Sequence, residues 1–360
     1  MKKVAFIIGS GYLLISELAI AMELYPNEYK VAFILNHFKG SQQVYTRVKK
    51  TNVFEEVYYL PQRQIVYTNR EKFKQCFGSK RWLRKHVNNY KDPGGYDIII
   101  GGGMTELCTP LYQVSKRKKR NTQFFEVDDG AGFAADYIDA YTWKSKVVCS
   151  ILRKHIPNKE MCGLYMFAKH RYIGNCNSTV YEIPDISTIP QIRDTLNYIY
   201  GIDEKIIQKV EEIQAFYLLS AHTTGDDDTR YNAELDLIKK LEEKIPQKIY
   251  VKKHPVNGTG DEEIRADIPM EILAMNCDMS QKVLISVFST AGFASRVLWH
   301  STFKSIFLFK LFRKELGEEK IMRYTEATEE IIEQYNCAQN VYVPETVIEL
   351  LGKMNEIEKK

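Results

Sequence analysis

Short runs of apolar residues alternate along the chain with longer segments in which apolar residues recur at helical spacing. The first run, residues 4–8, is followed by a helical pattern over 13–23 and by a second run at 30–35. A strand, a helix and a strand in this order are typical of a parallel βαβ unit. Further runs at 56–60, 97–100 and 123–127 continue the pattern. The first half of the chain is therefore predicted to be a doubly wound α/β domain.

A second series of the same kind begins near residue 216. Its strands are predicted at 216–220, 248–251, 283–287 and 305–309, and its helices at 232–244 and 344–359. Between the two series, Pro184 and Pro190 disfavour a helix over 181–189 and suit an extended crossing between domains. We therefore predict an α/β protein with two Rossmann-like, doubly wound domains, 1–188 and 189–360, and a cleft between them. Ligands of such domains bind at the carboxyl ends of the strands, so the loops after strands hold the candidate sites.

Composition narrows the classes of protein to which this chain can belong. Of its 360 residues, 44% are hydrophobic and 27% are charged, which is typical of a soluble globular protein. Lys and Arg number 50 and Asp and Glu 46, and a net charge of +4 is too small to make nucleic acid the expected partner. No apolar run approaches the roughly 20 residues of a membrane span. Seven scattered cysteines without a CxxC pair indicate neither a disulfide framework nor a zinc site, which favours a reducing, cytoplasmic setting.

Two basic segments make contact with a membrane surface an alternative to consider. Residues 116–120 are all Lys or Arg, and residues 303–314 mix aromatic and cationic side chains. Such segments attract an anionic lipid surface, although a run of charge is more commonly a solvated face. The expected location is the cytoplasm, with peripheral attachment at the inner face of the plasma membrane as an option.

Acids and glycines follow the strand predicted at 123–127. Asp128 and Asp129 come directly after it, and Gly130 and Gly132 let the backbone turn sharply. A carboxylate held out over a cleft is placed to act as a general base, which makes Asp129, with Asp128 beside it, a candidate catalytic residue. A solvated turn or a helix cap is the alternative interpretation of the same residues.

A histidine follows the strand predicted at 248–251, in the sequence Lys253-His254-Pro255. Because Pro255 restricts His254 to extended backbone, the imidazole and the neighbouring ammonium groups can be presented to a phosphate. His254 is therefore a candidate to neutralise or protonate a leaving phosphate oxygen. A surface histidine before a turn is the alternative.

Two hydroxyl side chains, Ser289 and Thr290, follow the strand predicted at 283–287 and precede a helical run at 292–299. Hydroxyls beside the free amides of a helix N-terminus form an anion site, and capping of the helix explains the same residues equally well. A serine nucleophile is disfavoured because Val287 and Ala291 stand where the glycines of a GxSxG elbow would be.

An acidic run, Asp226, Asp227 and Asp228, follows the strand predicted at 216–220. It is similar to the DxD metal clamp of glycosyltransferases that use nucleotide diphosphate sugars. A solvated loop, or the N-terminal charge of the next helix, is the more common meaning of such a run. No metal site is therefore predicted.

Taken in order, Asp128-Asp129-Gly130, Lys253-His254-Pro255 and Ser289-Thr290 resemble the motif set of bacterial sialyltransferases. The type most similar is glycosyltransferase family 52, the lipooligosaccharide and capsule sialyltransferases, with the bacterial polysialyltransferases as relatives. The match touches both predicted domains, and the order of the motifs and their positions at strand ends carry the likeness. The resemblance implies a GT-B fold, in which two Rossmann-like domains face a central cleft.

The resemblance also implies a donor and the residues that bind it. The donor would be CMP-sialic acid and the acceptor a glycan hydroxyl, on galactose or on sialic acid, with no cofactor and no metal. The donor-binding residues would be Lys253, Pro255, Ser289 and Thr290 beside the catalytic His254. Glu271, in the sequence Pro269-Met270-Glu271, would bind the ribose of the cytidine.

By the same resemblance the reaction is inverting, and a base removes the acceptor's proton as the hydroxyl attacks the anomeric carbon. Related enzymes imply Asp129 as that base, whereas the family 52 type also points to an acid of the second domain, here Asp226 or Asp227. Two alternative functions stay open: another GT-B nucleotide-sugar enzyme, either a UDP-sugar transferase or a 2-epimerase, and a capsule-assembly scaffold without enzymatic activity.

Overall fold

The computed structural model describes residues 1–61, 78–102, 106–127, 160–167, 179–222, 227–246, 248–255, 257 and 262–358, and for residues 227, 228, 357 and 358 it describes the backbone alone. The chain forms two compact units, Met1–Gly201 and Ile202–Lys360, which we describe separately. None of the helices in these ranges is long and apolar enough to cross a membrane.

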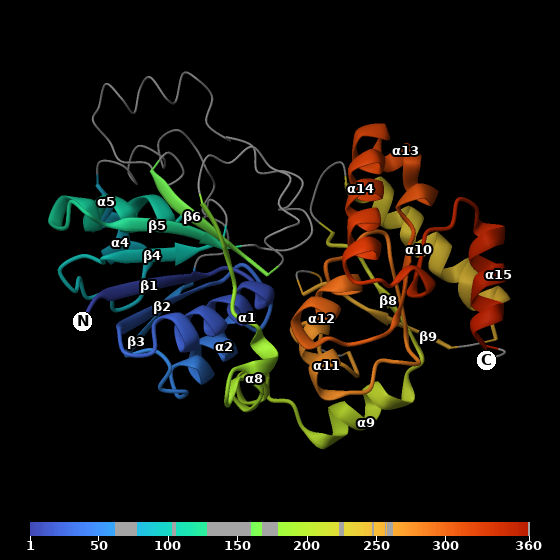
Figure 1. Cartoon of the computed structure of the whole chain (residues 1–360), viewed down its shortest axis with the longest axis horizontal. Helices are drawn as coiled ribbons and strands as arrows, with labels where there is room; N and C mark the ends of the chain where they lie inside the picture. The colour runs from blue at the N-terminus through green and yellow to red at the C-terminus, as the bar shows by residue number, and fades with distance from the viewer. Residues whose placement is uncertain are drawn as a thin grey trace. The chain divides into compact units, whose positions relative to one another are not determined.

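The described part of the first unit is built on a seven-stranded parallel sheet in the order β3-β2-β1-β4-β5-β6-β7 (Figure 1). Its strands are β1 (Lys3–Ile8), β2 (Tyr29–Leu35), β3 (Glu56–Leu60), β4 (Ile98–Gly101), β5 (Gln123–Val127), β6 (Met161–Met166) and β7 (Thr179–Glu182). The order runs outward from β1 to β3 and then continues on the other side of β1 with β4. The carboxyl ends of β1 and β4 therefore flank a topological switch point, where doubly wound sheets bind ligands.

Helices cover both faces of this sheet, as its doubly wound topology requires. On one face lie α4 (Ser79–His86) and α5 (Cys108–Lys118), and on the other α1 (Gly11–Ala19), α2 (Ser41–Val48) and α8 (Ile192–Tyr200) (Figure 1). The apolar runs of the central strands are buried on both sides, with Phe6 and Phe33 among the fully buried side chains. Burial on both faces explains why these strands are continuous apolar runs without alternation.

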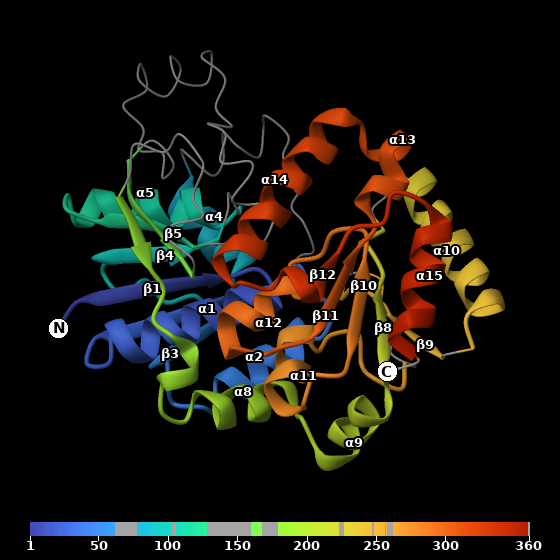
Figure 2. The same ribbon diagram turned by 45° about the vertical axis from the view of Figure 1, so that its right-hand side comes forward.

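The second unit holds a five-stranded parallel sheet in the order β12-β11-β10-β8-β9. Its strands are β8 (Ala215–Leu218), β9 (Ile249–Lys252), β10 (Val283–Ser286), β11 (Lys304–Phe307) and β12 (Val341–Tyr342). Its helices are α9 (Glu204–Glu212), α10 (Asp227–Lys244), α11 (Met270–Asn276), α12 (Ala291–Trp299), α13 (Arg313–Leu316), α14 (Glu318–Gln334) and α15 (Val347–Glu358). Helices α11 and α12 pack together on one face of the sheet, and α10 and α15 lie on the other (Figures 1 and 2). Here the switch point lies between β8 and β10.

The predicted fold class is confirmed, because both units are parallel sheets with interleaved helices. The predicted cleft between the domains stays a prediction. The segment expected to cross between domains, 181–189, instead completes β7 and forms a short 3₁₀ helix (Ile186–Thr188). Helix α8 follows it and packs on α1 and α2, so the first unit extends to Gly201, beyond the predicted division at residue 188.

Candidate functional site

A polar cavity of about 250 Å³ opens at the switch point of the second unit. Leu218 and Ser286, the last residues of the adjacent strands β8 and β10, both line it. The remaining lining comes from the loops after β8, β9 and β10 and from the helices α10, α13 and α14. It consists of Ser220, Ala221, Arg230, His254, Val287, Phe288, Ser289, Thr290, Leu316 and Tyr324. We call it the donor pocket after the donor-binding role that the sequence resemblance implies for His254, Ser289 and Thr290. It lies where the topology alone predicts a ligand.

Three residues predicted from separate sequence motifs meet in the donor pocket. His254 follows β9, while Ser289 and Thr290 follow β10, and β8 lies between those two strands in the sheet. Because all three strands are parallel, their carboxyl ends share one edge, which brings side chains 35 residues apart to one cavity. The cavity therefore unites the histidine motif with the hydroxyl motif.

The Thr290 hydroxyl does not cap helix α12. Thr290 occupies the N-cap position of α12, yet its side chain makes no capping hydrogen bond. The turn that leads into the helix is held instead by Ser286, whose Oγ accepts a hydrogen bond of 3.1 Å from the Ser289 amide. Ser289 and Thr290 both line the cavity at the N-terminus of α12, and their role in binding an anion stays a prediction.

Arg230 and Glu234 are functional candidates that sequence reasoning missed. Glu234 is fully buried and accepts hydrogen bonds from the amide of Ser220, at 3.0 Å, and from its hydroxyl, at 2.5 Å. Burial raises the pKa of Glu234, and the Ser220 hydrogen bonds and the Arg230 charge only partly oppose this. One turn earlier on α10, Arg230 brings a guanidinium to the cavity wall. The helix was predicted to begin at residue 232, after Arg230, so the i, i+4 spacing of Arg230 and Glu234 on one helix was not apparent in the sequence.

The loop that carries His254 is tied to the loop after β8. The Asn257 side chain accepts a hydrogen bond from the His222 amide at 2.7 Å and donates one to the His222 carbonyl at 3.0 Å. The backbone amide of Asn257 also donates to the His254 carbonyl at 2.8 Å. Asn257 therefore holds His254 in place relative to Ser220 and the end of β8.

The environment of His254 keeps its imidazole neutral at physiological pH. Burial, assisted by the nearby positive charge of Lys252, lowers the pKa of His254 to about 4. Lys252 is itself buried, which lowers its pKa to about 8. A neutral imidazole still carries one N–H that can donate a hydrogen bond to a phosphate oxygen.

The lowered pKa of His254 makes the stability of the second unit dependent on pH. An unfolded histidine titrates near pH 6.5, so between about pH 6.5 and 4 the unfolded chain binds a proton that the folded chain does not. The free energy of unfolding contributed by this residue is complete above pH 6.5 and is lost as the pH falls towards 4. We expect urea denaturation to show that the free energy of unfolding falls less between pH 7 and pH 5 in His254→Gln than in the wild type. Equal losses would contradict the prediction.

Three of the predicted donor-binding residues do not line the pocket. Lys253 forms an ion pair with Glu262, with 3.4 Å between Nζ and the carboxylate. Glu271 is buried in the first turn of α11, where burial raises its pKa although the Lys252 charge opposes this. Pro255, which follows His254, does not line the pocket either.

The predicted acids lie outside the described side chains. Asp128, Asp129 and Asp226 fall outside the described residues, and Asp227 begins α10 without a described side chain. Within the described part of the chain, no group of three or more His, Cys, Asp or Glu residues gathers to hold a metal ion.

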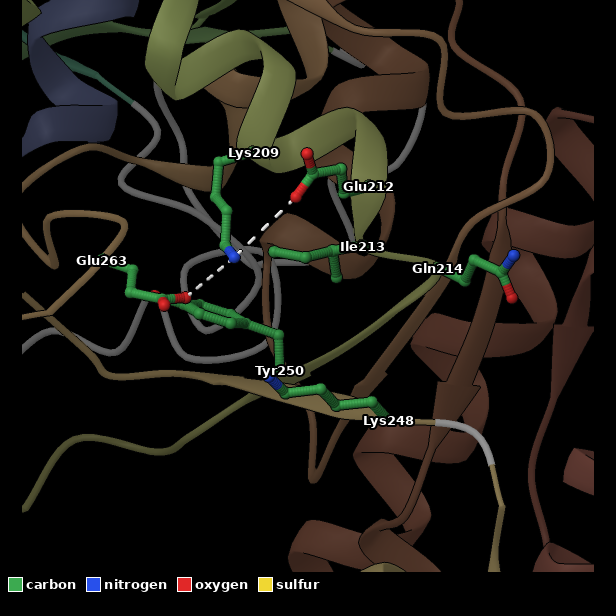
Figure 3. A pocket seen from close by; sticks show the side chains of 7 residues that line it. All are labelled: Lys209, Glu212, Ile213, Gln214, Lys248, Tyr250 and Glu263. Carbon is green, nitrogen blue, oxygen red and sulfur yellow. Dashed lines mark ion pairs between the residues drawn. The ribbon is translucent and has the colours of Figure 1, made fainter.

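Another hollow among the described residues of this unit lies at the opposite edge of the sheet and encloses about 350 Å³ (Figure 3). Gln214 and Lys248, which directly precede β8 and β9, line it together with Tyr250. Lys209 forms ion pairs across it with Glu263, at 3.2 Å, and Glu212, at 3.9 Å. The amino ends of parallel strands are not where such sheets bind ligands, so the donor pocket is the stronger candidate.

The first unit presents its own strand ends at its switch point. Ser10 caps α1 through a hydrogen bond of 3.1 Å from the Leu13 amide. Gly101 and Gly102 lie where a side chain would clash with a neighbour. A Cβ on Gly101 would lie 2.9 Å from Ile7, and a Cβ on Gly102 would lie 2.4 Å from Leu13. The close approach of strand β1 therefore accounts for Gly101, and the packing of α1 on the sheet accounts for Gly102.

In the two basic segments considered for membrane contact, several side chains form ion pairs or are buried within their own unit. In residues 116–120, Lys118 pairs with Asp92 at 2.7 Å and Lys119 with Asp97 at 2.6 Å. In residues 303–314, Phe303 and Phe309 are buried in the core. Peripheral membrane attachment stays a prediction.

Comparison with known proteins gives distant structural likenesses. No protein-family model and no curated protein sequence matches the chain. An α/β-galactoside α-2,3-sialyltransferase from Photobacterium phosphoreum is 11% identical, with a TM-score of 0.46, over 95% of this chain and 98% of the other. A candidate UDP-N-acetylglucosamine 2-epimerase from Listeria monocytogenes is 12% identical, with a TM-score of 0.47, over 99% of this chain and 88% of the other. Another UDP-N-acetylglucosamine 2-epimerase is 12% identical, with a TM-score of 0.42, over 85% and 79%. Likenesses this distant say nothing further about the chemistry of the chain.

Proposed function

We propose that this protein is an inverting, metal-independent sialyltransferase. It would move sialic acid from CMP-sialic acid to a glycan hydroxyl, on galactose or on sialic acid. Its product would be a bacterial surface polysaccharide or lipooligosaccharide. The observation that carries the proposal is the meeting of His254, Ser289 and Thr290 with Arg230 in one cavity at a switch point. The sequence resemblance to sialyltransferases supplies the identity of the sugar.

The charge of the donor pocket suits one phosphate. Arg230 provides a guanidinium, the two hydroxyls provide hydrogen-bond donors, and the N-terminus of α12 adds the positive end of its dipole. A nucleoside monophosphate leaving group carries less charge than a diphosphate, so these groups can stabilise it without a metal ion. A UDP-sugar transferase or a 2-epimerase, the alternative functions, would have to bind a second phosphate in the same place.

The proposed reaction has one displacement step. The acceptor oxygen attacks the anomeric carbon of the sialic acid, and the bond from that carbon to the phosphate oxygen breaks, leaving its electron pair on the phosphate of CMP. The His254 N–H donates a hydrogen bond to that oxygen as its negative charge grows. The acceptor's proton passes to a base, for which the sequence indicates Asp129, with Asp128 beside it and Asp226 or Asp227 as the second choice.

A donor comparison tests the proposal. We expect the purified protein to release CMP from CMP-sialic acid in the presence of lactose or a sialylated acceptor, at a rate that EDTA leaves unchanged, and to leave UDP-N-acetylglucosamine intact. Product analysis by NMR would show the new glycosidic bond and the inverted anomeric centre. A strict need for a UDP-sugar or for a divalent cation would overturn the sialyltransferase assignment in favour of the alternative.

A further inference from the structure

A buried carboxylate lies behind the wall of the donor pocket. Glu234 on α10 is fully buried, whereas Ser220, which follows β8, is half-buried and lines the cavity. The Ser220 amide donates to Glu234 Oε2 at 3.0 Å, and the Ser220 hydroxyl donates to Oε1 at 2.5 Å. One residue of the pocket wall therefore connects the cavity with an acid that solvent does not reach.

The charge of Glu234 depends on groups that a ligand of the pocket would contact. Burial raises the pKa of Glu234, and the hydrogen bonds from Ser220 and then the charge of Arg230 oppose this. Arg230 also lines the pocket, so a bound phosphate would neutralise its charge and bring further negative charge towards the carboxylate. Both changes disfavour the ionised form of Glu234.

Protonation of Glu234 would reverse its hydrogen bond with the Ser220 hydroxyl. Oε2 accepts from the Ser220 amide, so the proton would lie on Oε1, from which it can be donated to Ser220 Oγ. The hydrogen of the Ser220 hydroxyl would then be free to point into the cavity. The same side chain that serves the carboxylate would become a donor to a phosphate oxygen.

The elements packed around the carboxylate bring few other charges to it. On β8, Tyr217 is fully buried, and burial raises its pKa well above the usual value, so its phenol stays neutral. On α14, Tyr324 lines the pocket, and burial raises its pKa as well. Leu316 of α13 adds an apolar side chain to the lining. Among the groups that affect the pKa of Glu234, Arg230 is the charged one.

The basic groups at the ends of β8 and β9 differ in their access to the pocket. His254 lines it, and burial lowers the pKa of its imidazole to about 4. The ammonium of Lys252 is directed instead to the Ala266 carbonyl, at 3.4 Å, and the ring of His222 packs on Tyr231, with 4.6 Å between centroids. His254 is therefore the group whose response to a ligand has to be separated from that of the carboxylate.

We propose that Glu234 is a positioning residue that takes up a proton when a nucleotide phosphate binds in the donor pocket, and that Ser220 then donates its hydroxyl hydrogen to that phosphate. The proton comes from the solvent, and no covalent bond to the nucleotide is made or broken. The inference rests on the proposed function for the position of the phosphate. It also favours the leaving group, because the phosphate of free CMP carries about 1.5–2 negative charges at pH 7 and thus more than the diester of CMP-sialic acid.

Calorimetry of CMP binding at pH 7, in two buffers with different enthalpies of ionisation, measures the protons taken up and needs no variant. We expect the wild type to take up as much as about one proton for each CMP bound. Glu234→Gln should show no uptake, whereas His254→Gln should keep it. Glu242→Gln is the matched control, since Glu242 is exposed on the same helix, and it should also keep the uptake.

The affinity of Glu234→Gln distinguishes a positioning role from support of the fold. A glutamine can donate an N–H to Ser220 Oγ, as the protonated acid would, and no proton has to be taken up. We therefore expect Glu234→Gln to bind CMP at pH 8 about 3–10-fold more tightly than the wild type, whose affinity should fall as the pH rises from 7 to 8. A residue that only supports the fold would give weaker binding when it is replaced.

The possible results separate this inference from the proposed function. CMP binding without proton uptake in the wild type would overturn the role of Glu234 and leave the proposed function standing. Uptake that persists in Glu234→Gln and disappears in His254→Gln would assign the proton to the histidine and also overturn that role. Proton-coupled binding of UDP, without binding of CMP or transfer of sialic acid, would overturn the proposed function and leave the role of Glu234. Absence of binding of both nucleotides would overturn both.

Discussion

Replacing His254 with alanine is expected to lower kcat for sugar transfer by about 10²–10³-fold, the usual cost of removing one hydrogen-bond donor from the place where negative charge develops. His254 lines the donor pocket with Ser289 and Thr290, and its loop is held by Asn257. The ring is neutral because its pKa is about 4, so it acts as a fixed N–H donor and does not need to be protonated first. The effect should therefore fall on the chemical step more than on donor binding.

Steady-state kinetics with saturating acceptor would measure this effect, with His300→Gln as the matched control. The remaining activity of His254→Ala should not depend on metal ions. A kcat within about threefold of the wild type would be far below the usual effect of such a donor and would remove His254 from the mechanism.

Replacing Arg230 with glutamine is expected to weaken the binding of CMP-sialic acid by about 10–100-fold. A hydrogen bond to a charged group contributes roughly 1.5–3 kcal/mol, and about 1.4 kcal/mol corresponds to a tenfold change in Kd. Arg230 is a guanidinium in the lining of the donor pocket, so its loss removes the positive side chain that would face the phosphate. We expect Arg230→Lys to retain part of the affinity, because it keeps the charge and loses the planar fork of donors.

Calorimetric titration with CMP at several salt concentrations measures this prediction. Lys239→Gln is the matched control, since Lys239 is exposed on the same helix, α10, and does not line the pocket. The affinity of the wild type should fall more steeply with salt than that of Arg230→Gln. Equal Kd values for the wild type and Arg230→Gln would show that the phosphate lies elsewhere.

The fold could be predicted from the sequence because parallel strands buried on both faces are continuous apolar runs. The strand predicted at 283–287 became β10, Val283–Ser286, and the final helix predicted at 344–359 became α15, Val347–Glu358. Helix α8 could not be assigned to the first unit in advance, because its contacts with α1 and α2 link segments far apart in the chain. Periodicity identifies elements, and it does not say which distant elements they pack against.

The candidate site could be predicted only in part. His254, Ser289 and Thr290 were found because each follows a strand, but that they meet depends on the strand order, which no local pattern encodes. Lys253 was expected beside His254 and pairs with Glu262 instead, since neighbours in the sequence need not point the same way. Arg230 reaches the pocket from the first turn of α10, and one cation near the start of a helix is common in any sequence.

The contact of His37 with Glu106, with 2.8 Å between Nε2 and Oε1, could not be recognised from sequence. Each residue stands in a loop of ordinary composition, and only the placement of β1 between β2 and β4 brings the two together. Two residues 69 positions apart leave no motif when each follows a different strand.

The central position of β1 also sets an order of events during synthesis. Strand β1 pairs with β2 on one side and with β4 on the other, and β4 is synthesised about 90 residues later, beginning at residue 98. At the usual elongation rate of roughly 5–20 residues per second, the edge of β1 that pairs with β4 stays unpaired for about 5–20 s. A nascent chain of this length would expose that edge to other chains, so slow translation before β4 should favour aggregation or chaperone binding.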